Sequence, residues 1–569
     1  MRFSRFARLL DELEGVSGRY EKINLIAPLL AEADDASLRI IPLLLVGRFF
    51  ASYDERETGI SSKSVLKALE IATGVDTKRL EDDWRETGDL GLVAEKHKAS
   101  QASLVEEDPS IAQVHEAIVK LSELEGSGSQ SERIKRIAGL LSNAKTSVRA
   151  LTRLLIGDLR AGVGEGAIRD AVLIAFCPPD DPGSIPRELS DRGQRTLDIL
   201  NDLGEYAVLV KHHPDDFDER AHIRIGRPIK SMLAIRSTGL EEAAHKSGLP
   251  VYAEPKYDGF RVQIHKQRGD VSLFTRRLEN VTRQFPDIVR AVRDHVRGDV
   301  ILDSEVMGYE PDSKRLVPFQ DISQRIRRKH NIDELAERLP VVIEVFDILH
   351  LDGEDLLIRP FEERRALLGS AVEGEPWVIE PSRAQRFEDG ADLESFYAQC
   401  LADGYEGIML KTPGGLYKPG ARVGQMIKVK PTLETVDAVV VGGEYGEGKR
   451  SAWIASFVVA VRSPDGFVEI GRVGSGLKEK DEQGTSFGQV TEILEAHIIE
   501  THGRSVRVEP TLVVEVASEE IQKSDAYDSG YALRFPRIIR IRDDRSADEA
   551  TTLEDLEEMY RVQRGRDQS

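Results

Sequence analysis

Apolar residues recur at helical spacing through roughly the first 220 positions of the chain. The clearest examples are Phe6, Leu9, Leu10 and Leu13 and, later, Ile134, Ile137, Leu140 and Leu141. Residues at such intervals share one face of an α-helix, which then packs against a core. The pattern predicts an all-α domain over residues 1–224.

From about residue 251 the pattern changes to short apolar runs that are typical of strands, mixed with helical stretches. The strand candidates are 251–253, 271–275, 300–302, 341–349, 406–411 and 425–430. After Pro431 strands dominate, and the turn Pro464-Asp465-Gly466 separates two of them. We therefore expect an α+β domain over 225–431 and a small closed β-barrel over 432–569.

Length and composition agree with a multidomain globular protein. A chain of 569 residues predicts roughly three or four domains. Hydrophobic residues make up 40% and charged residues 31%, and no apolar run approaches the ~20 residues of a membrane span. The two cysteines, Cys177 and Cys400, lie far apart and cannot form a structural zinc site. We expect a protein of the reducing cytoplasm that does not enter a membrane.

The net charge of -21 argues only mildly against a nucleic-acid partner. Net charge averages over the whole surface, whereas a nucleic acid needs only a local basic stripe. The net charge alone therefore does not exclude a nucleic-acid-binding protein.

Candidate chemistry is concentrated at Lys256-Tyr257-Asp258-Gly259-Phe260, which is followed by Arg261. The lysine comes directly after a short apolar segment and Pro255, at the end of a predicted strand. A lysine placed there can attack a nucleotide α-phosphate and hold AMP or GMP as a phosphoramide. Gly259 allows close approach of the backbone, and Arg261 offers a planar fork for phosphate or sugar oxygens. An ordinary surface turn would also use Asp-Gly, so the motif by itself is weak.

Further segments follow the lysine in an order that suits nucleotidyl transfer. They are 274–277 with Arg276 and Arg277, 303–305, where Glu305 is expected to end a strand, 345–347 with Phe346, 406–407 with Glu406, and 428–430 with Lys428 and Lys430. An aromatic ring can stack on a purine, glutamates can hold ribose hydroxyls or Mg²⁺, and cations can neutralise a triphosphate. Singly, each has an ordinary explanation as a core aromatic, a solvated charge or an edge-strand lysine. Together and in this order, they predict a nucleotidyltransferase site.

The same neighbouring residues bear on the protonation state of Lys256, because an ammonium group cannot act as a nucleophile. At an unperturbed pKa of about 10.4, only about one lysine in a few thousand is neutral at pH 7. A nucleophilic lysine needs a lower pKa, from burial or from nearby cations. Arg261, Arg276, Lys428 and Lys430 are the candidates to lower it.

These motifs resemble the ATP-dependent DNA ligases of the archaeal and eukaryotic replicative type. The resemblance extends to three other segments, 155–164, 226–234 and 533–542, and so covers the full length of the chain. It implies a helical DNA-binding domain, an adenylation domain and an OB-fold domain. It also implies three steps in replication, repair and recombination: adenylation of Lys256 by ATP, transfer of AMP to the 5′-phosphate of a nick, and sealing by the 3′-hydroxyl.

The resemblance assigns roles residue by residue. Glu254 and Phe346 would contact adenine, Glu305 the ribose, and Arg261, Arg276, Arg422, Lys428 and Lys430 the rest of the nucleotide. Mg²⁺ would be required, with Glu406 and Glu305 as ligands. Arg542 and Arg545 belong to the last motif of the family. Nicked duplex DNA would be the partner of a monomeric enzyme.

Two segments depart from the family pattern. The last motif of the family usually reads Arg-x-Asp-Lys, whereas this chain has Arg542-Asp543-Asp544-Arg545. Arginine keeps the charge that would orient pyrophosphate but not the compact ammonium, so adenylation would be slowed but retained. Residues 101–105 lie where archaeal relatives carry a sliding-clamp peptide, but they lack its aromatic pair. A plain interdomain loop is favoured there over clamp binding.

Other functions compete with this interpretation. An mRNA guanylyltransferase or an RNA ligase would use the same lysine, but neither explains the helical N-terminal region or its glycines between Gly157 and Gly164, whose amides suit phosphate contacts. An NAD-dependent ligase would be expected to carry a cysteine zinc site, which two cysteines exclude. A DNA-binding scaffold with a degenerate pocket would not need Lys256, Glu305, Glu406 and Lys428 intact.

Overall fold

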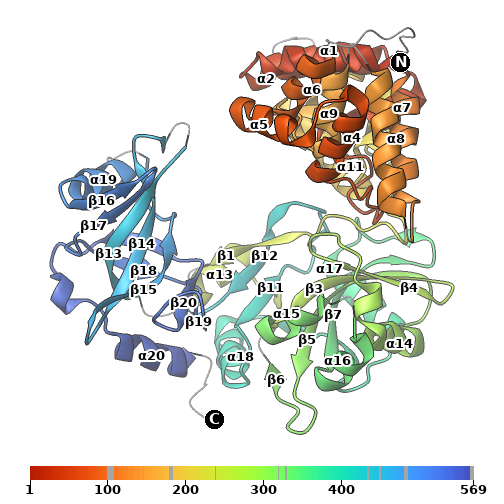
Figure 1. Ribbon diagram of the computed structural model, residues 1–569. Helices are drawn as coiled ribbons and strands as arrows, with labels where there is room; N and C mark the ends of the chain where they lie inside the picture. Colours follow the sequence, from red (N-terminus) through yellow and green to blue (C-terminus); the bar gives the residue numbers. More distant parts are fainter. Residues whose placement is uncertain are drawn as a thin grey trace. The chain divides into compact units, whose positions relative to one another are not determined.

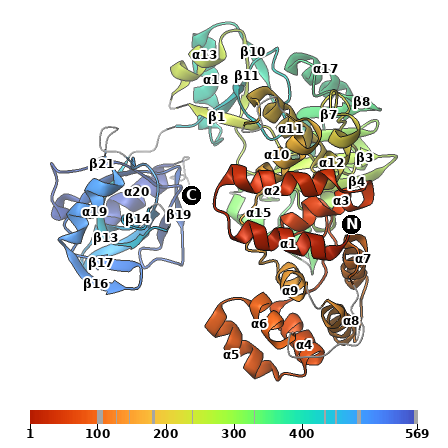
Figure 2. The same cartoon turned by 90° about the horizontal axis from the view of Figure 1, so that it is seen from above.

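The computed structural model describes residues 1–563 except 99–107, 127, 145–146, 179–183, 238, 318, 327, 329, 432–434, 448–449 and 480–484. Contacts divide the chain into two units, each made of several segments (Figures 1 and 2). Unit 1 comprises Met1–Leu233, Asp258–Ser382 and Pro413–Val423. Unit 2 comprises Ala234–Tyr257, Arg383–Thr412 and Gly424–Ser569. The segment 101–105, considered for clamp binding, lies outside the described residues.

The N-terminal part of unit 1 is helical, as its apolar spacing predicts. Its helices are α1 (Phe3–Glu14), α2 (Arg19–Ala31), α3 (Asp35–Leu45), α4 (Ser62–Thr73), α5 (Thr77–Thr87), α6 (Leu90–Lys98), α7 (Ile111–Ser122), α8 (Ser129–Asn143), α9 (Val148–Ile156), α10 (Glu165–Phe176), α11 (Arg187–Leu200) and α12 (Leu203–His212). Phe6, Leu9, Leu10 and Leu13 are all buried in one core with residues from the later helices. Gly157 ends α9 in the left-handed conformation, with φ of 75°, which a glycine adopts without strain.

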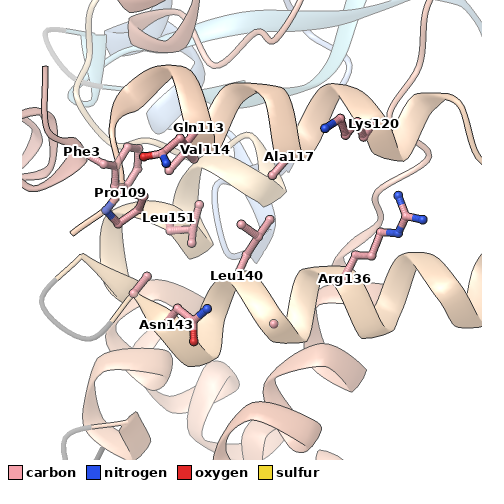
Figure 3. Close-up of a pocket in the computed structure, with 12 residues that line it drawn as sticks. Phe3, Pro109, Gln113, Val114, Ala117, Lys120, Arg136, Leu140, Asn143 and Leu151 are labelled. Atoms are coloured by element: carbon pink, nitrogen blue, oxygen red, sulfur yellow. The ribbon is translucent and has the colours of Figure 1, made fainter. Parts of the chain in front are cut away.

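A groove of about 370 Å³ runs between α7 and α8 (Figure 3). Val114, Leu140 and Leu151 form part of its apolar lining, and Lys120 and Arg136 lie on its border. A second groove of about 450 Å³ lies beside Trp377 in the same unit. Neither groove is lined by a predicted site residue.

The rest of unit 1 is a seven-stranded sheet with helices on its apolar face. The strands pair in the order β4-β3-β5-β7-β8, while β6 pairs with β5 and β9 pairs in parallel with β7. Alternate residues of these strands enter a core with α14, α15 and α17. The elements are β3 (Phe260–Gln267), β4 (Asp270–Thr275), α14 (Pro286–His295), β5 (Val300–Tyr309), β6 (Leu316–Val317), α15 (Phe319–Ile326), α16 (Ile332–Arg338), β7 (Val341–Leu351), β8 (Glu354–Asp355), α17 (Phe361–Ala371) and β9 (Ile379–Pro381).

Glu305 does not end its strand, and that expectation is wrong. β5 continues through Val306 and Met307 to Tyr309. The carboxylate stands opposite Arg261 of β3 in the antiparallel ladder. An acidic residue can remain inside a strand when a cation faces it across the ladder.

Unit 2 contains a five-stranded sheet in the order β1-β12-β11-β2-β10, packed against α13 and α18. Glu406 precedes β11 by two residues instead of opening it, and β12 begins at Arg422, three residues before the predicted start. The elements are β1 (Leu233–Ser237), α13 (Leu240–Ser247), β2 (Val251–Pro255), β10 (Gln385–Phe387), α18 (Gly390–Ala402), β11 (Ile408–Lys411) and β12 (Arg422–Val429).

The C-terminal part of unit 2 is rich in strands, as predicted. β13 pairs with β14 on one side and with β17 and then β18 on the other, so one long strand serves two parts of a seven-stranded sheet. A separate hairpin joins β19 and β20. The elements are β13 (Val436–Tyr445), β14 (Ile454–Ser463), β15 (Gly466–Val473), α19 (Phe487–Glu495), β16 (Ile498–His502), β17 (Ser505–Val508), β18 (Val513–Ala517), β19 (Glu520–Lys523), β20 (Tyr531–Arg534), β21 (Arg537–Ile541) and α20 (Leu553–Val562). Among the described residues, none of the helices has the length and apolar character needed to span a bilayer.

Candidate active site

Lys256 and Glu406 are held side by side by the backbone of unit 2. β2 and β11 are antiparallel, and their pairing continues past both strands. The Lys256 amide donates to the Gly407 carbonyl at 2.8 Å, and the Glu406 amide donates to the Lys256 carbonyl at 3.0 Å. Two motifs 150 positions apart, Lys256 and Glu406, therefore meet at one end of the sheet, where the lysine Nζ forms an ion pair with the Glu406 carboxylate.

Glu406 lies between two ammonium groups. Its Oε2 contacts Lys256 and lies 2.9 Å from the Nζ of Lys430, which directly follows β12. The residue is 7% exposed, so its charge is largely removed from water. Such a carboxylate is stabilised by the paired cations, and it in turn fixes the position of both lysine side chains.

Gly407 permits this close arrangement. Its φ is 141°, and a Cβ added there would lie 2.1 Å from the Val429 carbonyl oxygen. No side chain fits in that space without moving the β12 backbone. The glycine of the Glu406-Gly407 motif thus lets β11 approach β12 beside the lysines.

Lys428 and Lys430 project from the same face of the chain, as their alternation predicts. The pKa of Lys430 is lowered by burial and by the charge of Lys256, against the opposing effect of Glu406. Burial also lowers the pKa of Lys428, and the charges of Lys430 and Lys256 add to this effect. The lysines are therefore close enough to influence one another's protonation. We call Lys256, Lys428, Lys430 and Glu406 the lysine cluster.

Glu254 forms a buried ion pair that the sequence analysis did not identify. Its Oε1 lies 2.5 Å from the Nζ of Lys411, and the two side chains are 4% and 6% exposed. Lys411 ends the apolar run of β11, where a buried lysine requires an acidic partner. This need for an acidic partner is the feature of the sequence from which the pair could have been predicted.

Arg261 is held by protein groups of unit 1. It faces away from the core formed by its neighbours Phe260 and Val262. Its guanidinium donates to both carboxylate oxygens of Asp303, at 2.8 and 2.5 Å, and to the Met232 carbonyl at 2.7 Å. Asp303 is fully buried and also accepts a 2.7 Å hydrogen bond from the Tyr417 hydroxyl. Burial would lower the pKa of Arg261, but Asp303 raises it, so the guanidinium stays charged. The roles of Asp303 and Tyr417 were missed.

Phe346 lies at a β-bulge on the same face of the sheet as Arg261. Asp303 pairs with Asp347 and Ser304 pairs with Val345, which leaves Phe346 as the extra residue of β7. A bulge redirects a side chain, and Phe346 is half-buried between neighbours that are buried. The Arg261 guanidinium carbon lies 5.4 Å from the ring centroid. Glu305, opposite Arg261, is also half-buried, so this face presents an aromatic ring next to charged groups.

Gly259 brings β3 close to β5. A Cβ added there would lie 2.3 Å from the Val306 carbonyl oxygen. The close approach that the sequence predicts for this glycine is thus to the protein's own backbone.

Arg276 and Arg422 are exposed. Arg276 follows β4, and Arg422 is the first residue of β12. Both belong to unit 1, whereas the lysine cluster belongs to unit 2.

Arg542 and Arg545 of the last motif converge on Asp437 of β13. Arg542 donates to both Asp437 carboxylate oxygens at 2.8 Å, and Arg545 lies 2.8 Å from one of them. Arg542 also pairs with Asp544, and this hydrogen bond lowers the pKa of Asp544 to about 2. Both arginines are therefore paired with acids of their own strand-rich region.

The chain matches three family models in succession. They are described as the DNA ligase N terminus over residues 2–172, the ATP dependent DNA ligase domain over 231–430 and the ATP dependent DNA ligase C terminal region over 450–545. The lysine cluster, Arg261 and Phe346 fall within the second, and Arg542 and Arg545 within the third.

Curated relatives and a solved structure agree with this assignment. The chain is 42% identical to the DNA ligase of Nanoarchaeum equitans over 99% of both chains. It is 37% identical to the DNA ligase of Thermococcus fumicolans over 99% of both chains. The solved structure named Pmar-Lig_PreS3 has a similar fold, with a TM-score of 0.52 and 18% identity over 94% of this chain and 99% of that one. The chain belongs to the ATP-dependent DNA ligase family.

Proposed function

We propose that Lys256 is the residue that carries AMP in the ligase reaction. Enzymes of this family seal nicks in DNA through a lysyl-AMP intermediate, and this protein is such an enzyme. The observation that supports Lys256 is its placement against Glu406, with Lys430 on the other side of the same carboxylate. A nucleophilic lysine needs neighbours that orient it and neighbours that favour loss of its proton. Glu406 orients Lys256, and the positive charges of Lys428 and Lys430 favour loss of the proton.

The proposed first step is an in-line displacement at the α-phosphorus of ATP. A lone pair of the Lys256 Nζ forms the P–N bond, and the bond from the α-phosphorus to the bridging oxygen breaks, releasing pyrophosphate. Glu406 forms an ion pair with the ammonium before the reaction and is the group in contact with the proton that must leave. Lys428 and Lys430 stabilise the negative charge that develops on the phosphates.

The remaining residues are proposed to bind the nucleotide. Phe346 supplies a face for adenine, and Glu305 binds the ribose. For Arg261 we propose an action through Phe346, because its guanidinium is paired with Asp303 and stacks on that ring. The other assignments are Glu254 to adenine, Arg276, Arg422 and Lys430 to the rest of the nucleotide, and Arg542 and Arg545 to the departing pyrophosphate.

We propose that Mg²⁺ is required and that Glu406 and Glu305 contribute to its coordination. Magnesium in nucleotide sites is usually held by one or two carboxylates together with substrate phosphates. The described residues contain no cluster of three or more metal-ligating side chains, and a buried single carboxylate such as Glu406 fits an ion that arrives with a triphosphate. The ion would supply positive charge at the phosphates.

The domain limits 1–224, 225–431 and 432–569 are proposed to delimit the DNA-binding, adenylation and OB-fold domains. We propose that the enzyme acts on nicked duplex DNA as a monomer, and gel filtration with light scattering would test this state. We also propose a sliding-clamp partner through residues 101–105, on the basis of the position of that segment in the sequence. Copurification with a clamp, lost on deletion of 101–105, would test it.

Incubation with α-labelled ATP and Mg²⁺ is expected to label the protein, and added nicked DNA is expected to remove the label as sealed product appears. GTP and NAD serve as matched alternatives in the same assay. Labelling by GTP in preference to ATP would replace this proposal with a capping-type reaction. A protein that takes up no label from ATP would contradict it.

Replacing Lys430 by glutamine is expected to slow lysyl-AMP formation by about 10- to 100-fold and to move its pH–rate profile to higher pH. The charge of Lys256 lowers the pKa of Lys430, and repulsion between like charges is mutual. Removing Lys430 therefore removes a charge that helps Lys256 lose its proton, and loss of that proton then requires a higher pH. Single-turnover labelling from pH 6 to pH 10 measures both effects. Lys246→Gln, in an exposed pair with Glu242, is the control; an unshifted profile for Lys430→Gln would contradict the coupling.

A further inference from the structure

Glu519 places a carboxylate from the strand-rich region against the lysine cluster. It directly precedes β19, and its Oε1 accepts a 3.1 Å hydrogen bond from Arg236 of β1. Its Oε2 lies 3.7 Å from the Nζ of Lys430.

The position of Glu519 is tied to the β19–β20 hairpin. Its amide donates to the Arg534 carbonyl at 2.9 Å, at the end of the hairpin ladder. The side chain is 18% exposed, so it is largely covered by its partners. A displacement of the Glu519 backbone away from Lys430 would therefore move the hairpin as well.

In the contacts given for the described residues, cations outnumber acids at this place. Four cations, Lys256, Lys428, Lys430 and Arg236, lie near two carboxylates, Glu406 and Glu519. Lys428 also feels the charge of Glu519, which opposes the lowering of its pKa by burial. A carboxylate that bridges an arginine and a lysine has the charge and the hydrogen-bond acceptors that these cations would otherwise offer to a phosphate.

We propose that Glu519 stands in for a phosphate group. It neutralises Lys430 and Arg236 while no nucleotide is bound, and phosphate oxygens of the nucleotide or of pyrophosphate displace it. This inference rests on the proposed function, in which the lysine cluster binds the phosphates of ATP. Because two anions cannot share the same ammonium at full strength, phosphate binding and attachment of the hairpin oppose each other.

The opposition is reciprocal. If phosphate binding weakens the contact of Glu519, then loss of that contact must strengthen phosphate binding by the same factor. The β19–β20 hairpin is thereby a sensor of whether the phosphate site is filled. Glu519 is a positioning residue in this scheme, since it competes with a substrate group and does not touch the reacting atoms.

Calorimetric titration of the full chain with inorganic pyrophosphate at fixed, low ionic strength tests the competition. Glu519→Gln is expected to tighten pyrophosphate binding about fivefold or more, within the usual range of coupling between sites. Glu519→Asp, shorter by one methylene, is expected to give an intermediate gain and covers the case in which the glutamine variant does not fold. Glu515→Gln is the matched control, because Glu515 pairs with Arg540 in the same region and should leave the affinity unchanged.

Hydrogen exchange of β19 and β20 provides a second measurement that a purely structural role would not move. Pyrophosphate is expected to speed exchange in the unmodified protein and to have no further effect in Glu519→Gln. Unchanged or weaker pyrophosphate binding in both Glu519 variants, or exchange that ignores pyrophosphate, would overturn the inference. If the protein is labelled normally by ATP in that case, only this inference fails, whereas absence of labelling means that the proposed function fails.

Discussion

Replacing Lys256 by alanine is expected to lower labelling of the protein by α-labelled ATP by about a thousandfold or more. Alanine has no nucleophile to form the P–N bond, and no other lysine of the cluster stands in the same backbone pairing with Glu406 and Gly407 among the described contacts. The second step fails as well, because the AMP that it transfers comes from Lys256, but the third step does not depend on this lysine for AMP. A nick that already carries 5′-AMP does not need the lysine to take up AMP, so its sealing should persist at a measurable rate.

Lys246→Ala is the matched control for this experiment. Lys246 is also a lysine of unit 2 in an ion pair, with Glu242 on α13, but it is exposed. Its variant should be labelled at the normal rate. Labelling that survives in Lys256→Ala, or equal losses in both variants, would remove Lys256 from the proposed role.

Replacing Asp303 by alanine is expected to destabilise the seven-stranded sheet of unit 1 by about 3–5 kcal/mol. Asp303 is fully buried, and its removal leaves the Arg261 guanidinium without its bidentate partner. Tyr417 loses the acceptor of its hydroxyl at the same time. The chain has three tryptophans, and a background with Trp84 and Trp453 changed to phenylalanine leaves Trp377, beside Tyr309 of β5, as the fluorescent reporter of this sheet during urea unfolding.

Two further variants distinguish the effect of losing the buried Asp303–Arg261 ion pair from the effect of removing any charged side chain. Glu354→Ala removes an exposed partner of Arg359 and should change the free energy of unfolding by less than about 1 kcal/mol. Asp303→Leu combined with Arg261→Met replaces both ions by apolar groups and should recover most of the stability but not nucleotide binding. A Trp377 transition in Asp303→Ala that matches the unmodified protein would contradict the buried-pair assignment.

Local patterns were sufficient to predict several of the elements. The apolar repeats placed the N-terminal helices, and the strand at 251–253 placed Lys256 at a strand end. Alternation alone indicated that Lys428 and Lys430 share a face. These properties depend on residues that are close in sequence, where period and turn chemistry act directly.

Partners that lie far apart in the sequence could not be predicted in the same way. Tyr417 and Arg261 are 156 residues apart, and Asp303 is 42 residues from Arg261. Nothing near Arg261 shows that a buried acid will occupy its guanidinium, because that outcome depends on the register of β3 with β5. The same reason explains why Asp437 was not expected to bind Arg542 and Arg545, and why Glu305 was placed at a strand end.

The antiparallel pairing of β2 with β11 determines when, during protein synthesis, the surroundings of Lys256 can form. A growing chain exposes Lys256 long before residues 406–411 have been made, and Lys430 follows later still. Until then the lysine has neither the carboxylate that orients it nor the ammonium that shares that carboxylate. Contacts so distant in sequence form late, once the intervening chain has been ordered. The nucleophile thus matures only when the ribosome has completed about three quarters of the protein, and a truncated product ending before β12 would carry the reactive motif without its chemistry.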